Sequence, residues 1–242
     1  MVDVEFVNVL NKENDQATCN LLRIGDIKIL LDCGCNESSG ADFVACLDKV
    51  AEQAREAHYI FLSHATFMQL GALPYLHKLG LLVLNGIEGH VSNLEGIFAT
   101  SPIVKIGAQA MYEFTIQKKE VGVFETYTLQ NVEGAFEKIQ LVSYNENKRI
   151  KVKETELIVS AIPSGNSLGG TAWKIEYNKQ SILYGIELND KGSQVTPPIH
   201  QNSFKNANIL ITNGYIKSEL GQGNMLPQYV TEERLKTKIE KI

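Results

Sequence analysis

The chain has few cysteines and no long apolar run. Its four cysteines all fall in the first fifth of 242 residues: Cys19, Cys33, Cys35 and Cys46. They are too few and too clustered for a disulfide framework, which favours reduced thiols in an intracellular protein. No stretch approaches the roughly 20 apolar residues of a membrane span, and Asp3 and Glu5 stand where a secretory signal would carry basic residues. We therefore expect no membrane partner.

The chain also lacks an excess of positive charge. Its 23 basic and 28 acidic residues give a formal net charge of −5. A compact acidic domain is a poor electrostatic match for a phosphate backbone. Any contact with nucleic acid must then be local, or shared with a partner.

The order of the predicted elements indicates a mixed α/β fold. The first half alternates strands with helices, and the second half consists mostly of strands. We predict helices at 41–57, 68–79, 105–119 and 132–139. We predict strands at 4–10, 20–24, 28–32, 59–62, 81–84, 150–153, 155–161, 171–177, 181–188 and 208–212. This order favours two sheets packed face to face with helices outside, an αββα sandwich.

The composition changes after about residue 215. A glycine-rich stretch at 221–224 and Pro227 precede a charged helical pattern at 231–242, with Thr231 as its cap. We expect 216–242 to be a linker and the first helix of an incomplete further domain.

Three short patterns have alternative interpretations. Gly165–Gly169 has the form G-x-S-x-G of a serine-hydrolase elbow, followed by Asp190 and His200. An elbow needs a helix after the turn, but 171–177 is typical of a strand, so we predict a turn between strands. Cys33-Gly34-Cys35 is one residue shorter than C-x-x-C and has no second pair, which favours a buried thiol over a metal site. In the segment 148–153, basic residues alternate with Ile150 and Val152. This alternation predicts a half-exposed strand, and contact of the basic residues with RNA is the alternative.

The strand at 59–62 leads into Ser63-His64. A strand end followed by the pattern His-x-His-x-Asp-His can hold two zinc ions, which activate a bridging water as a nucleophile. His64 fills the first place, but Thr66, Met68 and Gln69 occupy the other three. A histidine hydrogen-bonded to a neighbour is therefore favoured over a metal ligand.

Several segments in the same order resemble the metallo-β-lactamase family, specifically its β-CASP branch of nucleases. They are Leu30–Gly34, Ser63-His64, Leu70–Tyr75, Gly165–Gly170 and Ile182–Tyr184. Within that branch, three further segments are similar to noncatalytic subunits of the machinery that cleaves and polyadenylates pre-mRNA: Ser101–Gly107, Val132–Ile139 and Gly169–Ile175. The resemblance implies a metallo-β-lactamase-like αββα domain at 1–215, truncated before most of a β-CASP domain.

The resemblance also implies a site that has lost most of its metal ligands. Asp32 matches the first motif, in which an aspartate orients a histidine. Asn166 falls where the third motif has a metal-binding histidine, and Glu187 where the fourth has a bridging aspartate. The implied degenerate metal-site positions are Asp32, His64, Thr66, Met68, Gln69, Asn166 and Glu187. We expect no catalytic residue, no bound metal and no other cofactor.

By the same resemblance we expect a nuclear, noncatalytic subunit that serves as scaffold or partner. Its partners would be an active zinc endonuclease paralogue, other cleavage and polyadenylation subunits and, within the complex, pre-mRNA. Two alternatives stay open. One is a residual metal-dependent RNA hydrolase, and the other is the equivalent noncatalytic subunit of the Integrator complex.

Overall fold

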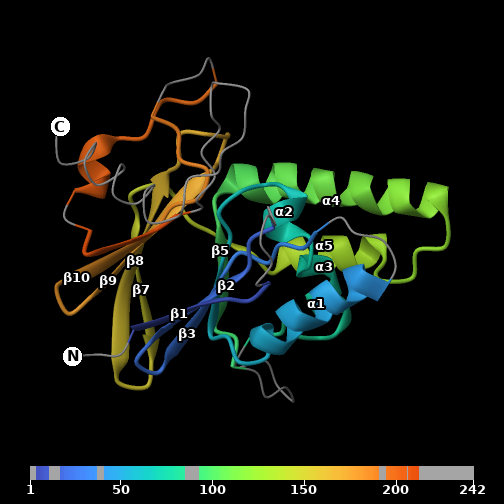
Figure 1. The fold of residues 1–242 in the computed structure, drawn as a ribbon, viewed down its shortest axis with the longest axis horizontal. Helices are drawn as coiled ribbons and strands as arrows, with labels where there is room; N and C mark the ends of the chain where they lie inside the picture. Colours follow the sequence, from blue (N-terminus) through green and yellow to red (C-terminus); the bar gives the residue numbers. More distant parts are fainter. Residues whose placement is uncertain are drawn as a thin grey trace, which may run out of the picture.

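The computed structural model describes residues 4–10, 17–36, 41–84, 93–190, 195–205 and 207–212. Within these ranges the chain forms two sheets packed face to face, with α-helices on the outer side of one sheet (Figure 1). None of the described helices is both long and apolar enough to cross a membrane. The predicted linker and helix at 216–242 lie outside the described ranges, so the domain division at residue 215 stays a prediction.

The larger sheet has six strands in the order β1-β2-β3-β4-β5-β6. Its strands are β1 (Val4–Asn8), β2 (Asn20–Ile24), β3 (Ile27–Leu31), β4 (Tyr59–Phe61), β5 (Gly96–Ala99) and β6 (Gln140–Leu141). The first three are antiparallel, and β3 to β6 run parallel. All three residues of β4 are buried, as expected for a strand covered on both faces. This confirms the central strand that leads to His64.

The predicted strand at 81–84 is wrong. Gly80 adopts φ +70° after the third helix, and the Leu81 N–H donates back to the Leu76 carbonyl at 3.0 Å. These features end a helix with a left-handed glycine. Leu82 is buried, but it enters the core from a turn. The strand that follows β4 along the chain and pairs with it is β5. It has only four residues and begins with Gly96, so it shows no strand pattern in the sequence.

Five α-helices cover one face of the six-stranded sheet (Figure 1). They are α1 (Ala41–Ala54), α2 (Phe67–Leu70), α3 (Leu73–Lys78), α4 (Ser101–Val121) and α5 (Leu129–Glu137). The helix predicted at 68–79 is in fact α2 and α3. Pro74 lies in the first turn of α3, where its missing N–H is tolerated, whereas inside a continuous helix it would break the hydrogen-bond ladder.

The second sheet has five strands in the order β11-β10-β9-β8-β7. Its strands are β7 (Asn147–Val152), β8 (Thr155–Pro163), β9 (Thr171–Tyr177), β10 (Gln180–Tyr184) and β11 (Ile209–Ile211). Its inner face packs on the six-stranded sheet, with Phe61 and Trp173 in contact at a ring-centroid distance of 4.8 Å. On its outer face the 3₁₀ helix η1 (Gln201–Phe204) inserts Phe204 into a small apolar cluster. The predicted fold class, two sheets with helices outside, is confirmed.

Candidate functional site

The predicted site positions lie at the strand ends where the two sheets meet. His64 leaves β4, and two residues of β9 hold the chain at this point. The Thr171 N–H donates to the Ser63 carbonyl at 2.8 Å, and Trp173 Nε1 donates to the Leu62 carbonyl at 3.2 Å. The second sheet therefore fixes the backbone that presents His64.

Asp32 follows β3 and is fully buried, with a left-handed φ of 63°. Its carboxylate accepts hydrogen bonds from Ser63 N at 2.7 Å, Ser63 Oγ at 2.8 Å and the Tyr184 hydroxyl at 2.8 Å. Thr18 Oγ1 donates a longer one at 3.4 Å. Burial raises the pKa of Asp32 from 3.8 to about 7, although the donors oppose this shift. Asp32 thus reaches His64 through the Ser63 hydroxyl.

The hydrogen bonds around His64 determine which ring nitrogen carries its proton. When Asp32 is ionised, the Ser63 hydroxyl donates its hydrogen to the carboxylate, and Ser63 Oγ then accepts from His64 Nδ1, 3.0 Å away. Burial lowers the pKa of His64 to about 4, so the ring is neutral at pH 7. Nε2 is then an acceptor, and the Ser164 hydroxyl donates to it at 3.0 Å. His64 therefore lies at the strand end with a hydrogen bond to its neighbour Ser63, while its place among the degenerate metal-site positions stays a prediction.

Ser164 contacts His64 although no sequence pattern singled it out. It is fully buried and lies directly before Gly165 of the G-x-S-x-G string. Gly170 makes the contact possible, since a Cβ on it would lie 2.5 Å from Ser164 Oγ and 3.0 Å from His64 Nε2. The pair is separated by 100 residues in sequence. Only the pairing of β8 with β9, placed against β4, brings it together.

Four other predicted positions form a second hydrogen-bonded group. Thr66 Oγ1 donates to Gln69 Oε1. Glu187 accepts from Asn166 Nδ2 at 2.9 Å and from Gln69 Nε2 at 3.5 Å. Burial raises the pKa of Glu187, and the two amide donors lower it. These hydrogen bonds connect the start of α2 to the β8–β9 loop and to the segment that follows β10.

Met68 lies apart from both groups. Its side chain is half-buried and packs against the core beneath the helices. Its carbonyl accepts from the Thr18 N–H at 2.8 Å. Gly34 lies so close that a Cβ on it would stand 1.6 Å from the same carbonyl oxygen. The backbone of α2 is therefore in close contact with the chain that follows β3.

The side chains at these positions do not fit the zinc ions that an intact His-x-His-x-Asp-His pattern would hold. A catalytic zinc takes at least three His, Cys, Asp or Glu ligands, whereas Thr66, Gln69 and Asn166 offer a hydroxyl and neutral amides. In the part of the chain that the structure describes, no three His, Cys, Asp or Glu side chains are placed to hold a metal ion. Both ring nitrogens of His64 already bind hydroxyl groups. The arrangement holds loops together by hydrogen bonds.

The other sequence patterns also have clear places. Gly165–Gly169 joins β8 to β9, so the context is strand, turn, strand, as predicted. Ser167 Oγ is buried and makes no hydrogen bond to any described residue, so no histidine activates it. Cys33 and Cys35 are buried thiols, and burial raises the pKa of Cys33. Arg149 and Lys151 are exposed while Ile150 is buried, which confirms the half-exposed strand.

The opposite pKa shifts of Asp32 and His64 predict cancelling pH effects on stability. Asp32 keeps its proton up to about pH 7 in the native state, so its contribution falls as pH rises from about 4 to 7. His64 stays neutral down to about pH 4, so its contribution falls as pH drops from 6.5 to 4. Asp32→Asn removes only the first effect. Relative to the unsubstituted chain, its free energy of unfolding should rise with pH between 4 and 6.5, by up to about 1.4 kcal/mol per unit.

Urea unfolding of both chains at a series of pH values measures this difference. Between pH 4 and 6.5, the stability of Asp32→Asn should rise with pH relative to that of the unsubstituted chain, because the other titrating groups are common to both. Parallel profiles for the two chains would contradict the buried, protonated state of Asp32.

Comparison with known proteins agrees with the fold. The family model described as "Metallo-beta-lactamase superfamily domain" matches residues 21–215. The crystal structure of unliganded yeast PDE1 is similar to this chain with a TM-score of 0.60 and 8% sequence identity. The match covers 100% of this chain and 84% of the PDE1 chain. At this identity it shows the fold alone.

Relatives at higher identity share one name. The probable cleavage and polyadenylation specificity factor subunit 2 of Drosophila melanogaster is 32% identical over 84% of this chain. The protein of the same name in Caenorhabditis elegans is 29% identical over 100% of this chain. The subunit 2 of Oryza sativa subsp. japonica is 28% identical over 81%. The chain spans about a quarter of these relatives, 25%, 26% and 25% respectively. On the family model and the fold together, the chain belongs to the metallo-β-lactamase superfamily.

Proposed function

We propose that this chain is part of a noncatalytic, pseudo-nuclease subunit of the nuclear machinery that cleaves and polyadenylates pre-mRNA 3′ ends. The names of its relatives support the process. The same names favour the cleavage and polyadenylation machinery over the Integrator complex. In this proposal the subunit is a scaffold or partner for an active zinc endonuclease paralogue and for other subunits of the complex.

The observation that carries the noncatalytic part is the hydrogen bonding of His64. A histidine that binds zinc must present a free lone pair, but here both ring nitrogens are hydrogen-bonded to hydroxyl groups, Nδ1 with Ser63 and Nε2 with Ser164. Glu187 is the other residue at these positions whose side chain could bind a metal ion. Its carboxylate accepts hydrogen bonds from the side-chain amides of Gln69 and Asn166. We therefore assign Asp32, His64, Thr66, Met68, Gln69, Asn166 and Glu187 as degenerate metal-site positions.

Metal content and nuclease activity test this proposal. After equilibration with zinc and dialysis, elemental analysis of the 242-residue chain should find zinc far below one ion per chain. The chain should not cleave single-stranded RNA in the presence of zinc or manganese, because no described group activates a water.

His64→Ala identifies any activity that belongs to the site, and His200→Ala, at an exposed histidine beside η1, is its matched control. Stoichiometric zinc, or RNA cleavage that His64→Ala abolishes and His200→Ala preserves, would refute the proposal. That result would establish the residual hydrolase instead.

A further inference from the structure

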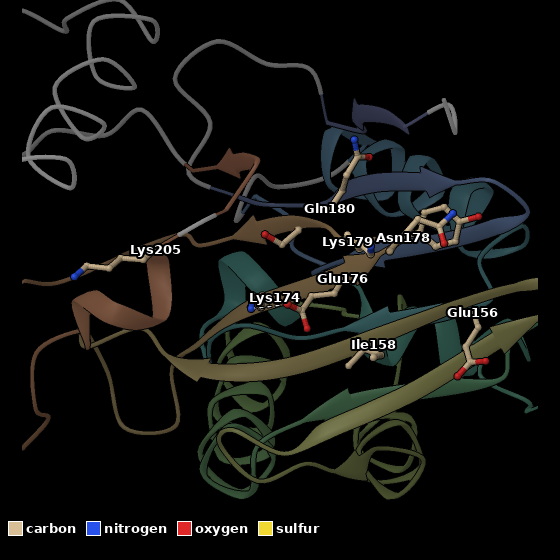
Figure 2. Close-up of a pocket in the computed structure, with 10 residues that line it drawn as sticks. Glu156, Ile158, Lys174, Glu176, Asn178, Lys179, Gln180 and Lys205 are labelled. Atoms are coloured by element: carbon tan, nitrogen blue, oxygen red, sulfur yellow. Dashed lines mark ion pairs between the residues drawn. The ribbon is translucent and has the colours of Figure 1, made fainter.

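The outer face of the five-stranded sheet carries a shallow cavity of about 630 Å³ (Figure 2). Strands β8, β9 and β10 form its floor, and the β9–β10 turn and the end of η1 border it. The pairing register places Arg149, Ile158 and Glu176 in one row across this face. The inner-facing residues of the same strands form the core between the sheets, so this row points away from it.

Basic side chains outnumber carboxylates on this face. The basic residues along and beside it are Arg149, Lys151, Lys174, Lys179 and Lys205, and the acidic ones are Glu156 and Glu176. Arg149 pairs with Glu156 at 3.7 Å, and Lys174 with Glu176 at 2.6 Å. The other three lysines are exposed and make no ion pair with any residue that the structure describes. The face is locally positive although the chain carries −5.

The chemistry of the face favours a phosphate chain over a protein partner. The centre of a protein interface is typically apolar and aromatic. Here the apolar residues of the cavity are Ile158, half-buried, and Tyr177, which packs toward the core between the sheets. Spaced lysines on a polar surface instead match the repeated negative charges of a nucleic acid backbone.

We propose that this face binds single-stranded RNA through its phosphates, with Lys179 and Lys205 as principal contacts. The inference deepens the proposed function, on which it rests for the identity of the polyanion. Contact is local and without base readout, because Tyr177, the aromatic residue among the described residues that line the cavity, packs toward the core between the sheets. Affinity should therefore be modest and strongly dependent on salt.

Fluorescence anisotropy of a labelled single-stranded RNA, titrated with the 242-residue chain at low ionic strength, measures this binding. The double variant Lys179→Glu/Lys205→Glu should weaken it by about tenfold and reduce the slope of log affinity against log salt by about 1.4, for two phosphate contacts. The matched control, Lys105→Glu/Lys119→Glu, makes the same charge change on exposed positions of α4. It should retain most of the affinity, and both variants should keep the thermal midpoint of the unsubstituted chain.

Equal weakening by the two variants would overturn the inference, since binding would then follow net charge alone. Undetectable RNA binding by the unsubstituted chain at low salt would also overturn it. Competition by poly-glutamate as effective as competition by unlabelled RNA would assign the face to an acidic protein segment instead. The zinc measurement is independent of this comparison, so the noncatalytic proposal and the RNA face can fail separately.

Discussion

Asp32→Ala is expected to lower the free energy of unfolding by about 3–5 kcal/mol at neutral pH. The substitution leaves the Ser63 N–H and the hydroxyl hydrogens of Ser63 and Tyr184 without their acceptor inside the protein. Each buried donor without a partner costs about 1–3 kcal/mol. Alanine also adopts the left-handed φ of 63° at a cost of about 1 kcal/mol. The relief of a buried charge offsets only part of this loss.

Asp32→Asn is the matched control for this effect. Asparagine tolerates the left-handed backbone and keeps one oxygen that can accept from the Ser63 N–H. The Tyr184 and Ser63 hydroxyls can rotate to accept from its amide, so a loss of about 1–2 kcal/mol is expected. Denaturant unfolding followed by circular dichroism measures both variants. Equal stabilities for Asp32→Ala and Asp32→Asn would show that the buried hydrogen bonds do not hold the strand ends together.

Trp173→Ala is expected to cost about 3–5 kcal/mol, through a cavity between the two sheets. Trp173 is 1% exposed, lies against Phe61 and donates to the carbonyl of Leu62, two residues before His64. Its removal takes away packing and one anchor of the strand end. Because Trp173 is the single tryptophan of the chain, its fluorescence is lost and unfolding must be followed by circular dichroism.

Trp173→Phe separates the two contributions. Phenylalanine keeps an apolar ring in contact with Phe61 but cannot donate to Leu62, so the expected loss is about half that of alanine. The ring nitrogens of His64 provide a second readout by NMR. Loss of the hydrogen bond to the Leu62 carbonyl should shift the strand end and so change the chemical shifts of these nitrogens. A loss below about 1 kcal/mol for Trp173→Ala would contradict the role of this residue in fixing the sheets.

The sequence predicted most of the elements because their patterns are local. The bounds of β2 and β9 agree with prediction, and α1 buries Phe43, Leu47 and Val50 at three- and four-residue spacing. Prediction failed where the pattern was short or interrupted. β5 has only four residues, and the apolar run at 81–84, which we predicted as a strand, contributes Leu82 to the core from a turn.

The residues of the candidate site were predictable from the sequence, but their contacts were not. Spacing and resemblance pointed to Asp32, His64 and Glu187, and to the noncoordinating residues at the other positions. The structure shows what those residues contact. Met68 faces the core beneath the helices, while Gln69 and Asn166 converge on Glu187. Because these contacts join different strands and loops, no spacing along the chain encodes them.

By itself, the sequence determined the strand that presents His64 and the chemical types of the residues around it, since periodicity and residue identity are properties of short segments. Only the tertiary structure decided that both ring nitrogens of His64 are hydrogen-bonded to serine hydroxyls, Nδ1 with Ser63 and Nε2 with Ser164. That outcome depends on β8 and β9 folding back against β4, which brings together residues 100 positions apart in a buried space where each polar atom must find a partner.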